Sequence, residues 1–197
     1  MGVLEEIIQI AKSNNGTITT AMTEQAGFSR GNLQYLADKG SLEKSARGIY
    51  ILPEMWEDEF FNLQCRFKRG IFSLESALFL WDLTDRTPNI FTMTFPATYN
   101  LTNAKLENIR CIQCKNELYE IGITQALSPS GNRLDLYNTE RTLCDILKPR
   151  SSVDIQIVTD SFKRYAAKAD KNIPLLSEYA KKLKVEKRLR SYLEVLL

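Results

Sequence analysis

The spacing of apolar side chains over the first forty residues predicts three short helices. Four apolar residues recur at helical spacing near the start: Leu4, Ile7, Ile8 and Ala11. They predict a helix over residues 3–13, which ends at the Asn-Asn-Gly sequence of residues 14–16. A short β-branched segment, 17–19, precedes a second helix that Thr19 or Thr20 can cap. A third helix is expected from Arg30 to about Lys39, with Ser29 before it as N-cap and Gly40 at its end.

Residues 41–52 complete this pattern as a β-hairpin whose turn lies at residues 45–48. Three helices followed by a hairpin are the order of a winged helix-turn-helix. The connection between the second and third helices is short and contains Gly27, as that motif requires. We therefore predict a winged helix-turn-helix DNA-binding domain over residues 1–55.

The pattern after Pro53 predicts a second domain, residues 56–197, of mixed α/β type ending in helices. An acidic segment, 54–59, marks the change. Alternating or continuous apolar runs predict four strands, at residues 90–95, 109–114, 118–123 and 133–137. Helical patterns cover residues 60–68, 73–81, 138–148 and most of the last 45 residues, where Pro174 is expected to break the helix. The chain as a whole is therefore expected to be a two-domain α/β protein.

The third helix has two different sides. Leu33, Leu36 and Ala37 share the side expected to face the core. The other side carries polar and aromatic residues suited to base contacts in the major groove: Arg30, Asn32, Gln34 and Tyr35. Asp38 also lies on that side, where a carboxylate opposes phosphate unless it accepts from a cytosine amino group.

A second set of residues is expected to hold the DNA backbone. Ser29 offers a hydroxyl at the helix N-terminus, and Lys39 lies at the far end of the same helix. Lys44 and Arg47 are expected at the tip of the hairpin, where a wing meets phosphate or the minor groove. The first 53 residues are electrically neutral, with five basic and five acidic residues, so a protein-docking adaptor remains an alternative.

The composition argues against most enzyme classes. The chain contains no histidine, which excludes histidine-dependent nucleophilic, acid–base and HExxH zinc chemistry. A carboxylate-dependent nuclease stays open as an alternative, with a candidate set in the second domain: Asp135, Glu140, Arg141 and Asp145. Each of them also has a structural interpretation: Asp135 lies on an expected strand, Glu140 lies in the first turn of a helix, and Arg141 and Asp145 form an i,i+4 pair. We expect no catalytic residues and no cofactor.

The chain has four cysteines, which we expect to be reduced thiols in the cytoplasm. It has no apolar run long enough for a membrane span, so we expect no membrane segment. Cys111 and Cys114 form the only close pair, and no second pair accompanies them, so we expect no metal site. Charge is uneven: residues 160–190 hold ten basic and four acidic residues, a net +6. This stretch suits either an anionic partner or a solvated helix face.

Several motifs resemble the AbiEi-type antitoxins of bacterial abortive-infection systems. They are Ala26-Gly27-Phe28-Ser29, the hairpin segments Leu42 to Lys44 and Arg47-Gly48-Ile49-Tyr50, residues 71–78 with Leu83-Thr84 and Pro88, and Tyr137-Asn138 with Glu140-Arg141-Thr142-Leu143 and Asp145. Together they extend from residue 17 to residue 147. The resemblance implies an antitoxin whose winged domain represses its own operon at inverted repeats.

The resemblance also implies that the C-terminal domain counters a nucleotidyltransferase-like toxin without forming a stable complex with it. We expect a monomer in solution and more than one copy on double-stranded DNA. The antitoxin role rests on the resemblance, whereas the DNA-binding role also follows from the residues of the third helix.

Overall fold

The computed structural model describes residues 2–196, with side chains up to residue 194, and divides the chain into two compact units. The first unit extends to Arg66 and takes in Leu127–Asn132. The second contains Phe67–Ala126 and the chain from Arg133 onward. The first unit thus continues eleven residues past position 55, through one more helix. The functional boundary after residue 55 stays a prediction.

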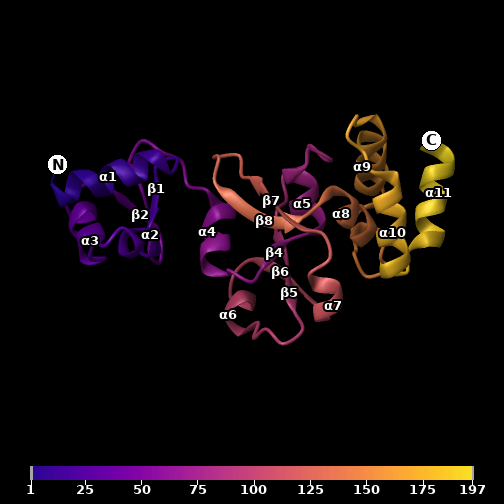
Figure 1. Cartoon of the computed structure of the whole chain (residues 1–197), viewed down its shortest axis with the longest axis horizontal. Coiled ribbons are helices and arrows are strands. Elements are labelled where there is room, and N and C mark those ends of the chain that lie inside the picture. The colour runs from indigo at the N-terminus through magenta and orange to yellow at the C-terminus, as the bar shows by residue number, and fades with distance from the viewer. Residues whose placement is uncertain (1, 197) are drawn as a thin grey trace. The chain divides into compact units, whose positions relative to one another are not determined.

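The first unit is built from four helices and a three-stranded antiparallel sheet (Figure 1). Its elements are α1 (Val3–Ser13), β1 (Thr17–Thr19), α2 (Thr20–Gln25), α3 (Gly31–Asp38), β2 (Glu43–Ala46), β3 (Ile49–Ile51) and α4 (Glu59–Arg66). The strand order is β1-β3-β2. The core consists of the residues that the helical periodicity places inward, together with three from the sheet and its approach: Ile7, Ala11, Ile18, Leu33, Leu36, Leu42 and Tyr50.

Local signals explain where these elements begin and end. The Thr19 hydroxyl accepts a hydrogen bond from the Met22 amide (3.2 Å), which caps α2 as expected. Gly16 has φ +77°, and a Cβ there would lie 2.4 Å from Met55, so only glycine fits this turn. The third helix begins at Gly31, one residue later than expected, and the Ser29 hydroxyl accepts from the Gly31 amide at 3.3 Å.

A buried carboxylate ties the late segment 127–132 into the first unit. The Asp58 side chain is 6% exposed and accepts hydrogen bonds from the Ser128 hydroxyl (2.5 Å) and the Asn132 side-chain amide (2.8 Å). The Asn15 side chain donates to the Gly131 carbonyl at 2.8 Å. Polar contacts between residues seventy or more positions apart in sequence therefore hold this segment.

The second unit combines a five-stranded mixed sheet with helices. Its elements are β4 (Ile71–Phe72), α5 (Leu74–Leu80), β5 (Phe91–Pro96), α6 (Thr102–Lys105), β6 (Ile109–Cys114), α7 (Asn116–Tyr119), β7 (Ile123–Leu127), β8 (Arg133–Tyr137), α8 (Thr139–Ile146), α9 (Ile155–Ala167), α10 (Ile173–Leu183) and α11 (Glu186–Leu196). The strand order is β6-β5-β4-β8-β7, with β4 antiparallel to β5 and parallel to β8. The mixed α/β class is as expected.

One expected strand is wrong. Residues 118–123 do not form a strand: they contain the end of α7 and a turn, and β7 begins only at Ile123. The carbonyls of Leu118 and Ile121 bind the Arg141 guanidinium at 2.5 and 2.9 Å. Because these carbonyls serve a side chain far away in sequence, they are not available for a sheet ladder.

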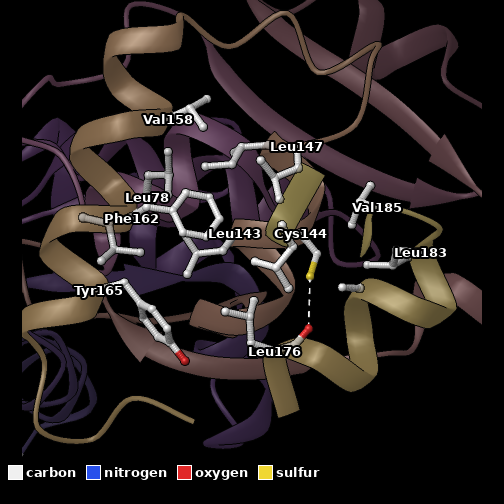
Figure 2. Close-up of a cluster of buried hydrophobic side chains, with 14 of the residues drawn as sticks. Leu78, Leu143, Cys144, Leu147, Val158, Phe162, Tyr165, Leu176, Leu183 and Val185 are labelled. Carbon is white, nitrogen blue, oxygen red and sulfur yellow. Dashed lines mark hydrogen bonds between the residues drawn. The ribbon is translucent and has the colours of Figure 1, made fainter. Parts of the chain in front are cut away.

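The helices α9 and α10 pack against α8, and α11 packs against α9 and α10 (Figure 2). Leu143 and Cys144 of α8 lie among Phe162 of α9 and Leu176 of α10, and the Cys144 thiol donates to the Leu176 carbonyl at 3.6 Å. The helical run is interrupted just before Pro174, as expected: α9 ends at Ala167 and α10 begins at Ile173. Pro174 lies in the first turn of α10, a position that proline favours because no amide donor is needed there. The helices α10 and α11 are separated at Lys184, whose φ is +59°.

None of the helices in residues 2–196 is long and apolar enough to cross a membrane.

Candidate nucleic-acid interface

The outward side of α3 presents the residues that sequence reasoning assigned to base contacts. Leu33 and Leu36 are buried in the core, whereas Arg30, Gln34 and Tyr35 are exposed. Asn32 is half-buried. Arg30 is the N-cap residue, so its side chain leaves the helix at its amino end, where the helix dipole is positive. Four side chains able to form hydrogen bonds thus share one helix.

Gln34 is held in place by two neighbours that sequence reasoning did not assign to it. Its side-chain amide donates to Asp38 Oδ1 (2.8 Å), and its carbonyl oxygen accepts from the Tyr50 hydroxyl (3.4 Å). Asp38 therefore orients Gln34. This contact explains why a carboxylate lies on the outward side of α3, whose other residues are suited to an anionic partner. An i,i+4 Gln–Asp spacing was the available signal for this contact.

Tyr35 and Lys39 form a second pair on the same helix. Tyr35 is 49% exposed, and the Lys39 ammonium lies 5.7 Å from the centre of its ring. This distance is within the range of a cation–π contact. The lysine thus stands beside the aromatic ring with its charge exposed to solvent.

The β2–β3 hairpin separates two residues that we expected together at its tip. Arg47 lies in the turn, followed by Gly48 at φ +76°. Lys44 lies further back, on β2 opposite Tyr50. The reason is the register: Ala46 pairs with Ile49, so the connection contains only Arg47 and Gly48. Both basic side chains are nevertheless exposed.

The chain after residue 55 supports this hairpin. The Ser45 hydroxyl of β2 donates to Glu57 Oε1 (2.9 Å), and the Asn62 side chain of α4 donates to the same Ser45 hydroxyl (2.8 Å). Asn62 is 6% exposed and also donates to Glu57 Oε1 at 2.6 Å. Nothing in the spacing of these residues indicated the contact, because it joins positions twelve and seventeen apart.

The basic side chains of α3 and the hairpin are not engaged in ion pairs in the part of the chain that the structure describes. Among the described residues no ion pair involves Arg30, Lys39, Lys44 or Arg47. Ser29 is exposed as well, although its hydroxyl already accepts from the Gly31 amide. Four cations from α3 and the hairpin are therefore free to meet an anionic partner.

The four residues of the nuclease alternative do not come together as one set. Arg141 is 1% exposed: its Nε donates to Asp145 at 2.9 Å, and its guanidinium lies 4.3 Å from the centre of the Tyr137 ring. Glu140 instead accepts from the Tyr165 hydroxyl (3.0 Å), between α8 and α9. Asp135 accepts from Gln125 at 2.8 Å, across two strands. Glu140 and Asp135 thus join elements of the second unit, whereas Asp145 pairs locally, with Arg141 inside α8 and with Lys148 just after it at 2.6 Å.

The cysteines show no ligand arrangement. Cys111 and Cys114 lie on β6 as free thiols, half-buried, and burial raises the pKa of the Cys111 thiol. In the part of the chain that the structure describes, no group of three or more histidine, cysteine or acidic residues could hold a metal ion.

A second basic surface lies on the last two helices. Four of its residues are exposed and have no ion-pair partner among the described residues: Lys181, Lys184, Lys187 and Arg190. Lys182 is paired with Glu178 at 2.7 Å, and Arg188 donates to the Leu147 carbonyl at 2.7 Å. We call the four unpaired residues the C-terminal basic surface.

Comparison with known proteins gives a family match for the first unit and a fold match for most of the chain. The fold is similar to the crystal structure of the RV2827C protein from Mycobacterium tuberculosis, with a TM-score of 0.58 and 15% sequence identity over 92% of this chain and 72% of that one. None of the curated proteins compared with the chain matches it. Residues 5–53 match the family model described as a transcriptional regulator, AbiEi antitoxin. The resemblance to AbiEi-type antitoxins that the motifs indicate is therefore confirmed over residues 5–53, which carry the signature of this family of antitoxin transcriptional regulators.

Proposed function

We propose that this protein is the antitoxin of a bacterial toxin–antitoxin system and represses its own operon through a winged helix-turn-helix in residues 1–55. In this proposal α3 is the recognition helix and enters the major groove at inverted repeats. Arg30, Asn32, Gln34 and Tyr35 contact base edges or sugars, and the β2–β3 hairpin is the wing. The single observation that carries the proposal is the exposed, unpaired charge of α3 and the hairpin, within a segment that matches a transcriptional-regulator family.

The phosphate contacts of this proposal come from two directions. Ser29 and Lys39 contact the backbone from the two ends of α3, and Lys44 and Arg47 contact it from the wing. Because phosphate contacts fix register but carry no sequence information, losing one of them weakens binding to all DNA alike. Losing a base contact weakens binding to the operator and relaxes the sequence preference.

The second half of the proposal assigns toxin neutralisation to residues 56–197. The second unit has its own sheet and its own helical core, which is far more structure than a DNA-binding domain needs for dimerisation. We propose a cytoplasmic protein that counters a nucleotidyltransferase-like toxin without a stable complex. No catalytic residue is assigned to this unit, because its candidate carboxylates are occupied by structural contacts.

The test separates the two activities in cells. The protein encoded next to this gene in its operon is expressed from an independent promoter, and growth is followed with matched levels of each variant. The Arg30→Ala, Arg47→Ala double variant should lose repression of a reporter behind the operon's upstream DNA, yet should still restore growth. A Lys68→Ala variant removes an exposed lysine outside residues 1–55 and should keep both activities.

Two outcomes would overturn this proposal. If the double variant at equal abundance cannot restore growth, the two activities are not separable. If it still represses the reporter as the wild type does, α3 and the hairpin are not the DNA-binding surface, and the adaptor alternative takes its place.

A further inference from the structure

The strand β7, Ile123–Leu127, is an edge of the five-stranded sheet and lacks the protection that edge strands usually carry. In the order β6-β5-β4-β8-β7 it has one neighbour, β8. Edge strands are commonly guarded against pairing by charged residues, proline or a bulge. The sequence of β7 is Ile-Thr-Gln-Ala-Leu, without charge, proline or glycine. Ile123 is 37% exposed and Leu127 is 60% exposed.

Two hydrogen bonds fix which backbone groups of β7 point outward. The Asn138 amide donates to the Gly122 carbonyl (2.7 Å), and the Ser128 amide donates to the Asn132 carbonyl (2.8 Å). Gly122 and Ser128 are six residues apart, as are Asn132 and Asn138, so no bulge lies between the two pairs. Because antiparallel ladders alternate, Thr124 and Ala126 bond toward β8. Ile123, Gln125 and Leu127 therefore direct their amides and carbonyls away from the sheet.

These three residues also share one exposed face of the strand. The burial of β7 alternates residue by residue, with Ile123, Gln125 and Leu127 exposed and the two residues between them half-buried. Consider a second β7 laid antiparallel to the first with Gln125 opposite Gln125. Ile123 of each strand then lies opposite Leu127 of the other, apolar against apolar, and each of the three opposed pairs can exchange both backbone hydrogen bonds. The strand is complementary to itself about Gln125.

We propose that β7 pairs with β7 of a second copy of this chain, which joins the two sheets across a two-fold axis at Gln125. A five-residue edge buries far less surface than the roughly 800 Å² per partner of a stable interface. The pairing is therefore weak in free solution and strengthens where two copies are held close together. Its use on DNA rests on the proposed function: a two-fold interface matches the symmetry of an inverted repeat.

The pairing itself is tested on the full-length protein without DNA, so its outcome does not depend on the proposed function. A hydrogen-bonded antiparallel pair places Cα atoms about 5.5 Å apart, within the range of a disulfide. The variant Gln125→Cys is oxidised mildly over a series of protein concentrations and examined on a non-reducing gel. We expect a covalent dimer whose yield rises with concentration. The wild type, with its four native cysteines, and the matched control Thr124→Cys, one position along the strand, should form little.

A second variant checks the register. Adding Ile123→Lys to Gln125→Cys puts a charge opposite Leu127 of the other strand, and should lower the dimer yield several-fold while the circular dichroism spectrum stays unchanged. Equal cross-linking of Gln125→Cys and Thr124→Cys would overturn the proposal. An unchanged yield in the folded double variant would overturn it as well. Loss of DNA binding in a separate assay would leave both results unaffected.

Discussion

At the scale of single residues, the most informative contact on α3 is the one between Gln34 and Asp38. A carboxylate beside a phosphate backbone weakens binding, yet here its oxygen lies 2.8 Å from the Gln34 amide nitrogen. A glutamine whose amide is already oriented loses less side-chain entropy when it meets a base. If α3 binds DNA as proposed, Asp38 lowers the affinity for all DNA and holds the Gln34 side chain in place.

Replacing this carboxylate should separate affinity from sequence preference. Asp38→Ala removes a negative charge and releases Gln34, so affinity for unrelated DNA should rise, while discrimination at the Gln34 position falls by about 1–3 kcal/mol. The matched control Asp38→Asn keeps an oxygen acceptor for Gln34 and should retain the preference. Competition titrations with upstream and unrelated DNA measure both. An Asp38→Ala variant with the wild-type preference would show that Gln34 does not read a base.

The stability of the second unit depends on Arg141. It is buried, and its guanidinium joins Asp145 to the Leu118 and Ile121 carbonyls. Arg141→Met leaves both carbonyls without their donor and leaves Asp145 with Lys148 as its remaining ion-pair partner, which should cost about 3–5 kcal/mol of unfolding free energy. Arg141→Lys keeps the charge but not the planar set of donors, so it should restore only part of this loss.

Urea unfolding followed by tryptophan fluorescence measures this effect. Of the two tryptophans, Trp56 is 92% exposed and responds little, whereas Trp81 donates to the Tyr137 carbonyl at 2.7 Å within the second unit. An Arg141→Met variant with wild-type stability would mean that the polar contacts of this side chain contribute nothing net.

The Cys144 thiol should make the stability of the second unit depend on pH in the alkaline range. Burial raises the pKa of its thiol from 9.0 to about 12. Above pH 9 the unfolded chain releases this proton and the folded chain does not, so the stabilising contribution is full below pH 9 and is lost as the pH rises toward 12. Stability should therefore fall over this window, and Cys144→Ala should flatten the fall. Urea midpoints of the wild type and of Cys144→Ala, measured at several pH values, test this prediction. The same dependence of the midpoint on pH in both proteins would contradict it.

The bounds of several helices and strands could be predicted from the sequence, because neighbouring residues determine where these elements begin and end. The strands at residues 109–114 and 133–137 and the helix over 3–13 have the expected bounds, because apolar periodicity and short caps determine them. Asn138 caps α8 through the Arg141 amide at 2.9 Å, as its position before the helix indicates. These signals lie within a few residues of the features they specify.

What could not be predicted depends on contacts between distant positions. The segment 118–123 has apolar residues suited to a strand, but Arg141 takes its carbonyls. The two-residue β4 is too short to carry a periodicity. At the candidate site the exposed residues of α3 were predicted, whereas the support of Gln34 by Tyr50 and of Ser45 by Asn62 was not. Such contacts follow from tertiary packing, which a single sequence does not display.

Residues of α10 and α11, and Lys184 between these helices, form the C-terminal basic surface. We expect it to contact DNA phosphates in addition to those proposed for α3 and the hairpin. Each phosphate contact contributes about 0.9 to the slope of log affinity against log salt, so replacing Lys181, Lys184 and Lys187 by glutamine should lower the slope by about 2.7. Binding titrations at several salt concentrations measure this, with Lys68→Gln as the control. An unchanged slope would mean that this surface meets solvent or another partner.

In the proposed function the chain has two activities in different parts, DNA binding in residues 1–55 and toxin neutralisation in residues 56–197. The family match covers residues 5–53, and the helical core that includes Leu143, Phe162 and Leu176 lies wholly in the second unit. The contact of Ser45 with Glu57 and Asn62 adds a refinement: the hairpin depends on residues beyond position 55. DNA-binding measurements should therefore use the full chain.

Whether α3 and the hairpin bind DNA is tested by titrating the operon's upstream DNA with the full-length wild type and the Arg30→Ala, Arg47→Ala variant at several salt concentrations. Arg30 is proposed to contact a base and Arg47 a phosphate, so the variant should lose about 1–3 kcal/mol through Arg30 alone. The preference for upstream over unrelated DNA should fall, and the salt slope should drop by about 0.9 for each lost phosphate contact. Affinity, preference and slope all equal to those of the wild type would contradict the account, because the exposed charges of α3 and the hairpin would then not bind DNA.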